Sequence, residues 1–120
     1  MKTTGSGGTS GLPYVPAVTA QGTLLFVSGQ IPTRNGELVT GNVGEQTELV
    51  MENIAAILRS AGATVDDIVR CGVALADLND LPEFNAAYVR AFGSHLPART
   101  VIGAQLPGWA VEIDCIATVN

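Results

Sequence analysis

This sequence is poor in charged, aromatic and metal-binding residues. Only 14% of its 120 residues are charged and 5% are aromatic, and it has one histidine and two cysteines. With a single histidine, His95, and no Cys/His cluster, a zinc site has almost no ligands to draw on. We therefore expect no metal.

The sequence also lacks basic runs and long apolar runs. Its six Lys and Arg residues are scattered and its net charge is −5, which argues against a large nucleic-acid footprint. No stretch has membrane-spanning length, and the N-terminus does not resemble a signal peptide. Cys71 and Cys115 lie in apolar, strand-like segments without C-x-x-C spacing, which predicts two buried, reduced thiols. We expect a cytoplasmic protein with no nucleic-acid or membrane partner.

What the chain has in quantity is hydrophobic residues, at 47%. A protein with so little surface charge often covers its surface with copies of itself, so composition predicts an oligomer. The length suits one domain, which we place at residues 12–120. Residues 1–11 are rich in Gly, Ser and Thr without apolar periodicity, and we expect a flexible N-terminal tail there.

The apolar periodicity predicts the order β-β-β-α-β-α-β-β. Strands are expected at 17–20, 23–31, 37–40, 67–78, 99–104 and 110–119. A first amphipathic helix is expected at 44–61, ended by Gly62. A second begins at Asp80, which can cap it together with Glu83 in a capping-box-like pair. Its apolar face contains Leu81, Phe84, Tyr88 and Phe92, with Asn85 among them.

Two helices can cover only one face of such a sheet. The other apolar face must be covered by other subunits or remain exposed. The pattern therefore predicts an α+β fold, a mixed sheet with two helices packed on one face.

Two C-terminal segments place single charges in otherwise apolar, strand-like sequence. Leu-Pro-Ala-Arg-Thr-Val at 96–101 contains Arg99, and Val-Glu-Ile-Asp-Cys-Ile-Ala at 111–117 contains Glu112. A buried strand seldom holds a charge unless the charge is paired or used. These two charges are the first candidates for a functional site.

Together with Leu-Pro at 106–107 and Val-Ser-Gly-Gln-Ile-Pro at 27–32, these segments resemble the Rid family (reactive intermediate deaminases, also called the YjgF family). The resemblance covers about residues 13–117. It implies a chorismate-mutase-like fold and a homotrimeric barrel with ligand clefts between subunits. It also implies hydrolysis of reactive enamines and imines, such as 2-aminoacrylate and 2-iminopropanoate, to a 2-keto acid and ammonia.

The resemblance also assigns roles to the two charges. Arg99 would hold the substrate carboxylate with its planar fork, and its alternative is a surface ion pair. Glu112 would position the water that attacks the imine carbon. It shares a strand face with Asp114, and both acids could instead line a solvated edge of the sheet. The connection from 108 to 111 is one residue shorter than is common in the family, so Asp114 is the alternative carboxylate.

Five further residues match substrate-binding positions of the family. Tyr14 would form a cleft wall, or simply pack. Ser28 and Gly29 would contact the ligand, or mark a β-bulge. Asn85 is expected to be a core amide with satisfied hydrogen bonds, although the family often has Asn there. Val101 stands where many members carry Cys or Ser, so it offers only backbone groups.

The implied reaction needs no metal or organic cofactor, because positioning of an already electrophilic imine supplies most of the gain. Two alternatives remain open. One is a non-catalytic, small-carboxylate-binding or chaperone-like trimer, which would use the same arginine. The other is a Rid relative acting on a larger, pathway-specific imine, which the changed residues around Tyr14 and Val101 favour.

Overall fold

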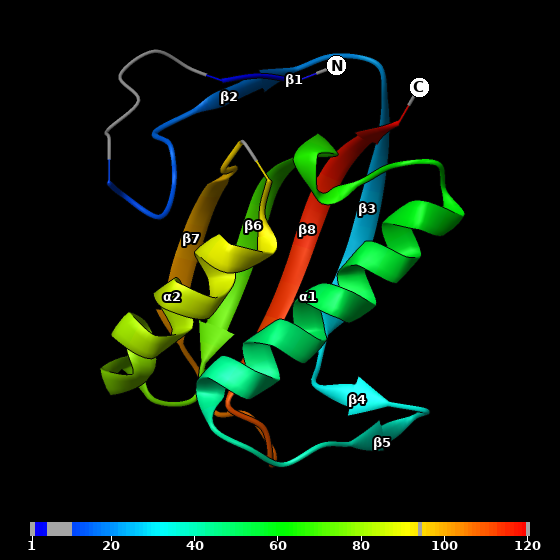
Figure 1. Cartoon of the computed structure of the whole chain (residues 1–120). Coiled ribbons are helices and arrows are strands. Elements are labelled where there is room, and N and C mark those ends of the chain that lie inside the picture. The colour runs from blue at the N-terminus through cyan, green and yellow to red at the C-terminus, as the bar shows by residue number, and fades with distance from the viewer. Residues whose placement is uncertain (1, 5–10, 94, 120) are drawn as a thin grey trace.

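Two helices pack against one face of a four-stranded mixed sheet in the computed structural model, which describes residues 2–4, 11–93 and 95–119 (Figure 1). This is the fold class that the sequence predicts. The strands are β1 (Lys2–Thr4), β2 (Val18–Ala20), β3 (Thr23–Gln30), β4 (Thr33–Arg34), β5 (Glu37–Leu38), β6 (Ile68–Leu75), β7 (Ala98–Gly103) and β8 (Val111–Val119). The helices are α1 (Val43–Ser60) and α2 (Leu81–Ala91), with short 3-10 turns η1 (Val65–Asp67) and η2 (Leu78–Asp80).

The main sheet has the order β3-β8-β6-β7, so β3 and β7 are its edges. β8 runs antiparallel to both β3 and β6, and β6 pairs with β7 in parallel through the crossover that contains α2. The pairing between β3 and β8 shifts between Val27 and Gln30, which agrees with a β-bulge, one of the two alternatives for Ser28 and Gly29. The predicted order of elements is confirmed, with β1 and β4 added.

The ends of α1 follow directly from its sequence. Asn42 Oδ1 accepts a hydrogen bond from the Glu45 N–H at 2.8 Å, and Glu45 Oε1 accepts one from the Asn42 N–H at 3.1 Å, which is a capping box. The helix stops before Gly62, whose φ of +81° suits glycine. The apolar residues at helical spacing point to the sheet, as predicted.

The start of α2 differs from the prediction. Pro82 lies in its first turn, as expected, but the Asp80 side chain makes no capping hydrogen bond. Glu83 does not complete a capping pair either, because its Oε2 accepts a hydrogen bond from the Gly44 N–H at 2.8 Å. A contact between the two helices thus replaces the local cap.

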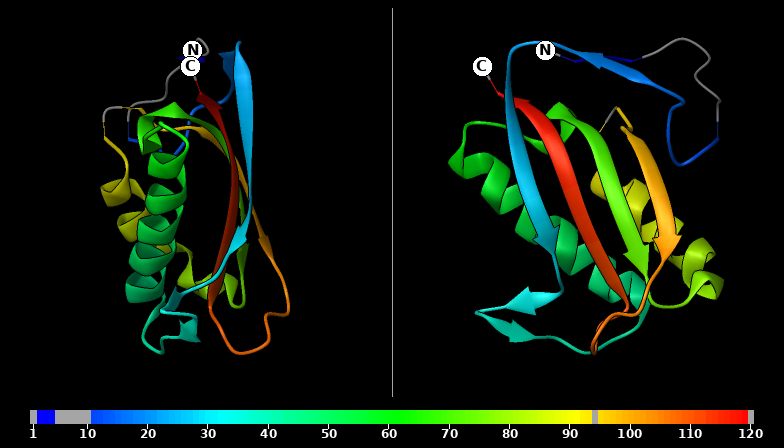
Figure 2. Two further views of the ribbon diagram at one scale, coloured as in Figure 1. Left: turned by 90° about the vertical axis from the view of Figure 1, so that its right-hand side faces the viewer. Right: turned by 180° about the vertical axis from the view of Figure 1, so that it is seen from behind.

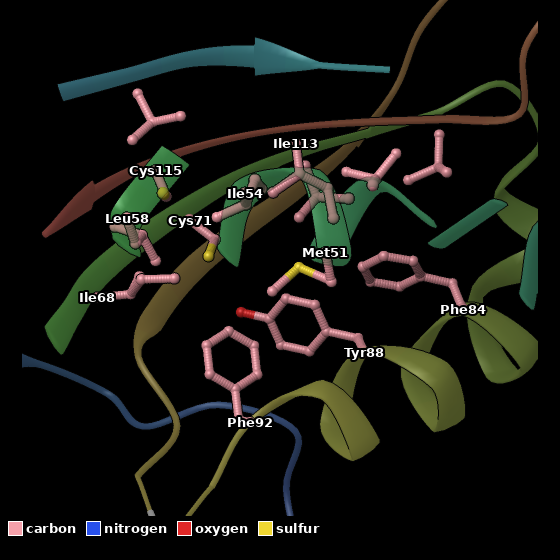
Figure 3. Close-up of a cluster of buried hydrophobic side chains, with 14 of the residues drawn as sticks. Met51, Ile54, Leu58, Ile68, Cys71, Phe84, Tyr88, Phe92, Ile113 and Cys115 are labelled. Carbon is pink, nitrogen blue, oxygen red and sulfur yellow. The ribbon is translucent and has the colours of Figure 1, made fainter. Parts of the chain in front are cut away.

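The hydrophobic core lies between the helices and the sheet (Figure 3). α1 contributes Ile54 and Leu58, and α2 contributes Phe84 and Tyr88, all fully buried. Cys71 on β6 and Cys115 on β8 are register partners and are both buried free thiols, as predicted.

The opposite face of the sheet carries no helix (Figure 2). Phe26 is 69% exposed, Ile102 56% and Leu24 44%. Apolar side chains of this size gathered on one open face are typical of a surface that packs against another protein. The expectation that the helices leave one face uncovered is confirmed.

The N-terminal prediction falls partly on described residues. Within the predicted tail, Lys2–Thr4 form β1, which pairs antiparallel with β2, whereas residues 1 and 5–10 lie outside the described residues. The predicted strand at 37–40 is shorter and forms a hairpin with β4, turned at Asn35 and Gly36, both with positive φ. Across the described part of the chain, no helix is long and apolar enough to cross a membrane.

Candidate functional site

Arg99 lies on the edge strand β7, on the face of the sheet that the helices cover. Its register partner is Cys71, which points into the core. The Arg99 Cζ lies 5.0 Å from the ring centre of Tyr88, 5.7 Å from that of Phe84 and 5.5 Å from that of Tyr14. Three aromatic rings from two distant segments therefore surround one guanidinium, within the range of cation–π attraction.

No anion balances this cation among the residues that the structure describes. Arg99 belongs to neither of the two ion pairs found there, and its Nη1 is buried without a hydrogen-bond partner. Burial lowers the pKa of the guanidinium, and the neighbouring Tyr88, Tyr14 and Cys71 oppose that shift. The alternative of a surface ion pair for Arg99 is therefore wrong within the described chain.

The loop that carries Tyr14 runs beside the start of β7. The Val15 N–H donates to the Pro97 carbonyl at 3.4 Å, and the partly exposed Tyr14 ring faces Arg99. Tyr14 thus lies beside the guanidinium, and its role as a cleft wall stays a prediction. Val101 lies on the same face, two residues along, with Val73 as its register partner.

Asn85 follows Phe84 on α2 and is half-buried. Its Oδ1 is buried and has no hydrogen-bond partner. The expectation of a fully satisfied core amide is therefore wrong for this oxygen. A buried acceptor without a partner is costly, and no donor among the described residues offsets that cost for this oxygen.

Glu112 lies on the opposite, open face of the sheet. Its register partner on β6 is Ala74, while its neighbours Val111 and Ile113 are fully buried toward the helices. A Cβ at Gly29 would lie 2.5 Å from Glu112 Oε2, so the carboxylate rests directly over the glycine of the bulge. Ser28, beside it, is exposed. The bulge and the close approach thus occur together at Gly29.

Asp114 differs from Glu112 in having a partner. Its Oδ1 lies 3.7 Å from Arg70 Nη1, and this ion pair passes over Gly72, where a Cβ would lie 2.8 Å from Asp114 Oδ2. Both acids line a hollow of about 200 Å³ on the open face. No ion pair or hydrogen bond to Glu112 is found in the described segments, which leaves Glu112 as the carboxylate free to hold a water.

The predicted site residues thus form two groups. Tyr14, Arg99 and Val101 belong to the helix-covered side near the β7 edge, and Glu112 lies over Gly29 near the β3 edge. The structure does not bring Arg99 and Glu112 together within one chain. A site that uses both must combine two copies.

Sequence reasoning missed the aromatic surroundings of Arg99. Phe84 and Tyr88 were assigned to the apolar face of α2, and their rings, 5.2 Å apart, do pack in the core. Their spacing of four residues was a signal that they share a helix face, but nothing local shows that this face meets β7. Among the described residues, no cluster of three or more potential metal ligands is present.

The chain is similar in sequence to proteins of archaea and yeast and matches one family description. Residues 9–119 match the family described as endoribonuclease L-PSP. The chain is 41% identical over 109 residues to a RutC family protein of Pyrococcus horikoshii, covering 88% of this chain and 86% of that protein. It is 38% identical over 112 residues to the mitochondrial protein mmf2 of Schizosaccharomyces pombe, covering 89% and 88%.

Solved structures agree with the fold. A Rid-family protein of unknown function from Yersinia pestis, YyfB, superposes with a TM-score of 0.82 at 31% identity, covering 89% of this chain and 87% of that one. E. coli TdcF, solved with bound serine, gives a TM-score of 0.75 at 36% identity, covering 90% and 89%. The fold and a capacity for small ligands are thus present among close structural neighbours.

Proposed function

Because the chain belongs to the endoribonuclease L-PSP family, whose members also carry the names YjgF and Rid, we propose that it hydrolyses reactive enamines and imines of 2-amino acids. The substrates are of the 2-aminoacrylate and 2-iminopropanoate type, and the products are a 2-keto acid and ammonia. The cytoplasm remains our predicted compartment, although two relatives from Schizosaccharomyces pombe are named as mitochondrial.

The observation that carries the proposal is the unpaired guanidinium of Arg99. A half-buried cation held by three rings, with no anion among its described neighbours, is ready to bind one from outside. Its planar fork suits a carboxylate, which every 2-imino acid carries. Binding there would orient the adjacent C=N carbon, and positioning alone supplies a large share of the rate.

Glu112 would supply the second half of the chemistry. Its carboxylate accepts a proton from a water aimed at the imine carbon, and the water oxygen forms the new C–O bond. This proton passes to the nitrogen to give a tetrahedral amino alcohol; the hydroxyl proton of that adduct then also moves to the nitrogen through the carboxylate, the C–N bond breaks, and ammonia leaves as the C=O bond forms. The net change is addition of one water and loss of one ammonia, and it requires no oxidant.

The sheet topology supports a cleft between copies. Arg99 lies on one edge strand, and Glu112 lies over the other edge strand at Gly29. Head-to-tail contacts between copies form a ring when the rotation from one copy to the next closes. A homotrimer closed in this way, with the open sheet faces turned inward, would cover the apolar face and place Arg99 of one copy beside Glu112 of the next.

The charge distribution favours an imine over RNA, despite the family's descriptive name. The net charge is −5, and the few basic residues form no run along the sequence. Binding of a polyphosphate chain depends on several neighbouring cations. One buried guanidinium suits a single small anion instead.

The test is a coupled assay in which a pyridoxal-phosphate-dependent dehydratase generates 2-aminoacrylate from serine. The purified protein should accelerate release of ammonia and pyruvate, Arg99→Ala should abolish the acceleration while the fold is retained, and Arg99→Lys should recover little of it. Sedimentation should show a trimer of 12.4 kDa chains. Full activity of Arg99→Ala would refute the site.

The assay also separates the alternatives. Binding of pyruvate or 2-ketobutyrate without turnover would indicate a non-catalytic carboxylate-binding trimer. Turnover that rises across a panel of 2-imino acids with longer side chains would indicate a larger natural substrate. Val101 is apolar and lies two residues from Arg99 on the same face of β7, which makes a preference for longer side chains worth testing.

A further inference from the structure

The first turn of α1 reaches across the molecule to the start of β8. Gln46 is 8% exposed, and its Oε1 accepts a hydrogen bond from the Ala110 N–H at 2.8 Å, although the two residues are 64 positions apart. Its Nε2 donates to the Gly41 carbonyl at 2.9 Å. Both ends of this buried amide are therefore occupied, and each holds a different loop.

Ala110 is held on its other side as well. Its carbonyl accepts a hydrogen bond from the Ala76 N–H at 3.0 Å, just beyond the end of β6. β8 begins at the next residue, and Glu112 follows with Ala74 as its register partner. The backbone two residues before Glu112 is thus fixed by one strand neighbour and by one side chain, that of Gln46.

We propose that Gln46 is a positioning residue for the candidate reaction, which fixes the start of β8 so that the Glu112 carboxylate rests over Gly29. This inference rests on the proposed function. Gln46 lies on α1, and Glu112 points to the open face of the sheet, so Gln46 acts only through the backbone of Ala110.

The space around Glu112 explains why this position must be held closely. Its Oε2 already lies where a side chain at Gly29 would stand, so the carboxylate has little freedom on that side. Displacement of a reacting group by about 1 Å can lower a rate by roughly a hundredfold. Without Gln46, the Ala110 N–H also loses its acceptor, which favours a local shift of the strand start.

The experiment compares two substitutions of Gln46. Gln46→Met fills the same space but offers neither an acceptor to the Ala110 N–H nor a donor to the Gly41 carbonyl, whereas Gln46→Glu keeps the acceptor and loses only the donor. We expect Gln46→Met to lower kcat about ten- to hundredfold and Gln46→Glu to recover most of it. Affinity for 2-ketobutyrate should stay within about twofold in both variants, because Arg99 lies on the other face of the sheet.

Thr47→Val is the matched control. Thr47 is fully buried in the same turn, and its Oγ1 donates to the Val43 carbonyl, so its hydrogen bond stays within α1. This variant should change stability without a specific loss of kcat. If kcat in the three variants merely follows their melting temperatures, Gln46 is structural and the proposal is wrong.

A readout without catalysis keeps the inference distinct from the proposed function. Hydrogen exchange at the Ala110 amide should be faster in Gln46→Met than in the wild type and Thr47→Val, and the NMR chemical shifts of the Glu112 side chain should change in Gln46→Met alone. An inactive wild type that shows these changes refutes the function and retains the positioning role. An Ala110 amide as protected in Gln46→Met as in the wild type overturns the positioning role.

Discussion

The two faces of the main sheet differ in how their charged side chains are buried and paired. On the helix-covered face, Arg99 is half-buried among three rings and has no anion among its described neighbours. On the open face, Glu112 and Asp114 border a hollow, and Asp114 is paired with Arg70. One face therefore holds a cation without an anion among its described neighbours, and the other holds two solvent-accessible acids, of which one is paired.

This difference shows how one small chain can keep a free guanidinium and a free carboxylate, which would otherwise pair with each other. Had Arg99 and Glu112 faced each other within the chain, they would form an ion pair that neutralises both. Separation by the sheet keeps the guanidinium free for a carboxylate and the glutamate free for a water. In the proposed homotrimer, the two groups would meet only at a cleft between copies.

The open face is tested most strongly by Glu112→Gln. The amide keeps the shape of the side chain but cannot accept a proton, so turnover should fall roughly 10²–10⁴-fold. Binding of 2-ketobutyrate, followed by calorimetry, should persist or tighten, because a negative charge near the bound anion is removed. Asp114→Asn should matter much less, since Asp114 is already paired with Arg70. An inactive Asp114→Asn beside a normal Glu112→Gln would move the role to Asp114.

Mixed trimers test whether one cleft combines Arg99 of one copy with Glu112 of the next. Arg99→Ala and Glu112→Gln chains are co-expressed with different tags, and trimers containing both are isolated. If each cleft takes Arg99 from one copy and Glu112 from the next, every trimer that contains both chains has one intact cleft in three and should show about a third of wild-type turnover. A site within one chain would leave the mixture no more active than its components.

The helix-covered face should also respond to alkaline pH in a way that the open face does not. Burial raises the pKa of Cys71 to about 11 and that of Cys115 to about 12. The folded state therefore holds these protons more tightly than the unfolded state, where a thiol titrates near pH 9. The resulting stabilisation is complete below pH 9 and is lost as the pH rises toward 11.

The free energy of unfolding in urea should accordingly fall by about 1–3 kcal/mol across that interval, with the two adjacent thiols contributing jointly. The variant Cys71→Ala/Cys115→Ala should be less stable at pH 7 but lose less between pH 9 and 11. Tyr88, whose pKa burial also raises, accounts for part of the remaining slope. An unchanged slope in the double variant would contradict this account.

The periodicity of the sequence predicted those features of the fold that depend only on residues close together in the chain. The alternation of Val111, Glu112 and Ile113 placed the glutamate opposite the core, and the structure confirms it. The capping residues of α1 and the glycine after it likewise act within a few residues. Such local preferences are visible in a single sequence.

What the sequence did not show depends on distant partners. The Asp80 cap is wrong because Glu83 bonds to Gly44 in the other helix, where it satisfies a helix N-terminal N–H instead. The rings around Arg99 come from α2 and from the loop at Tyr14, which meet only after folding. A resemblance identified Arg99, but only the tertiary contacts explain why it lacks an anion.

The smallest predicted effect concerns the outer wall of the Arg99 face. Tyr14 is the most exposed of the three rings around the guanidinium, and cation–π attraction at such sites is worth about 0.5–1 kcal/mol. Tyr14→Leu should therefore weaken binding of 2-ketobutyrate about two- to fivefold by calorimetry, because the guanidinium is held less firmly. Tyr14→Phe keeps the ring and should bind like the wild type. Equal weakening in both variants would assign the contact to the phenolic hydroxyl, and no change in either would remove Tyr14 from the site.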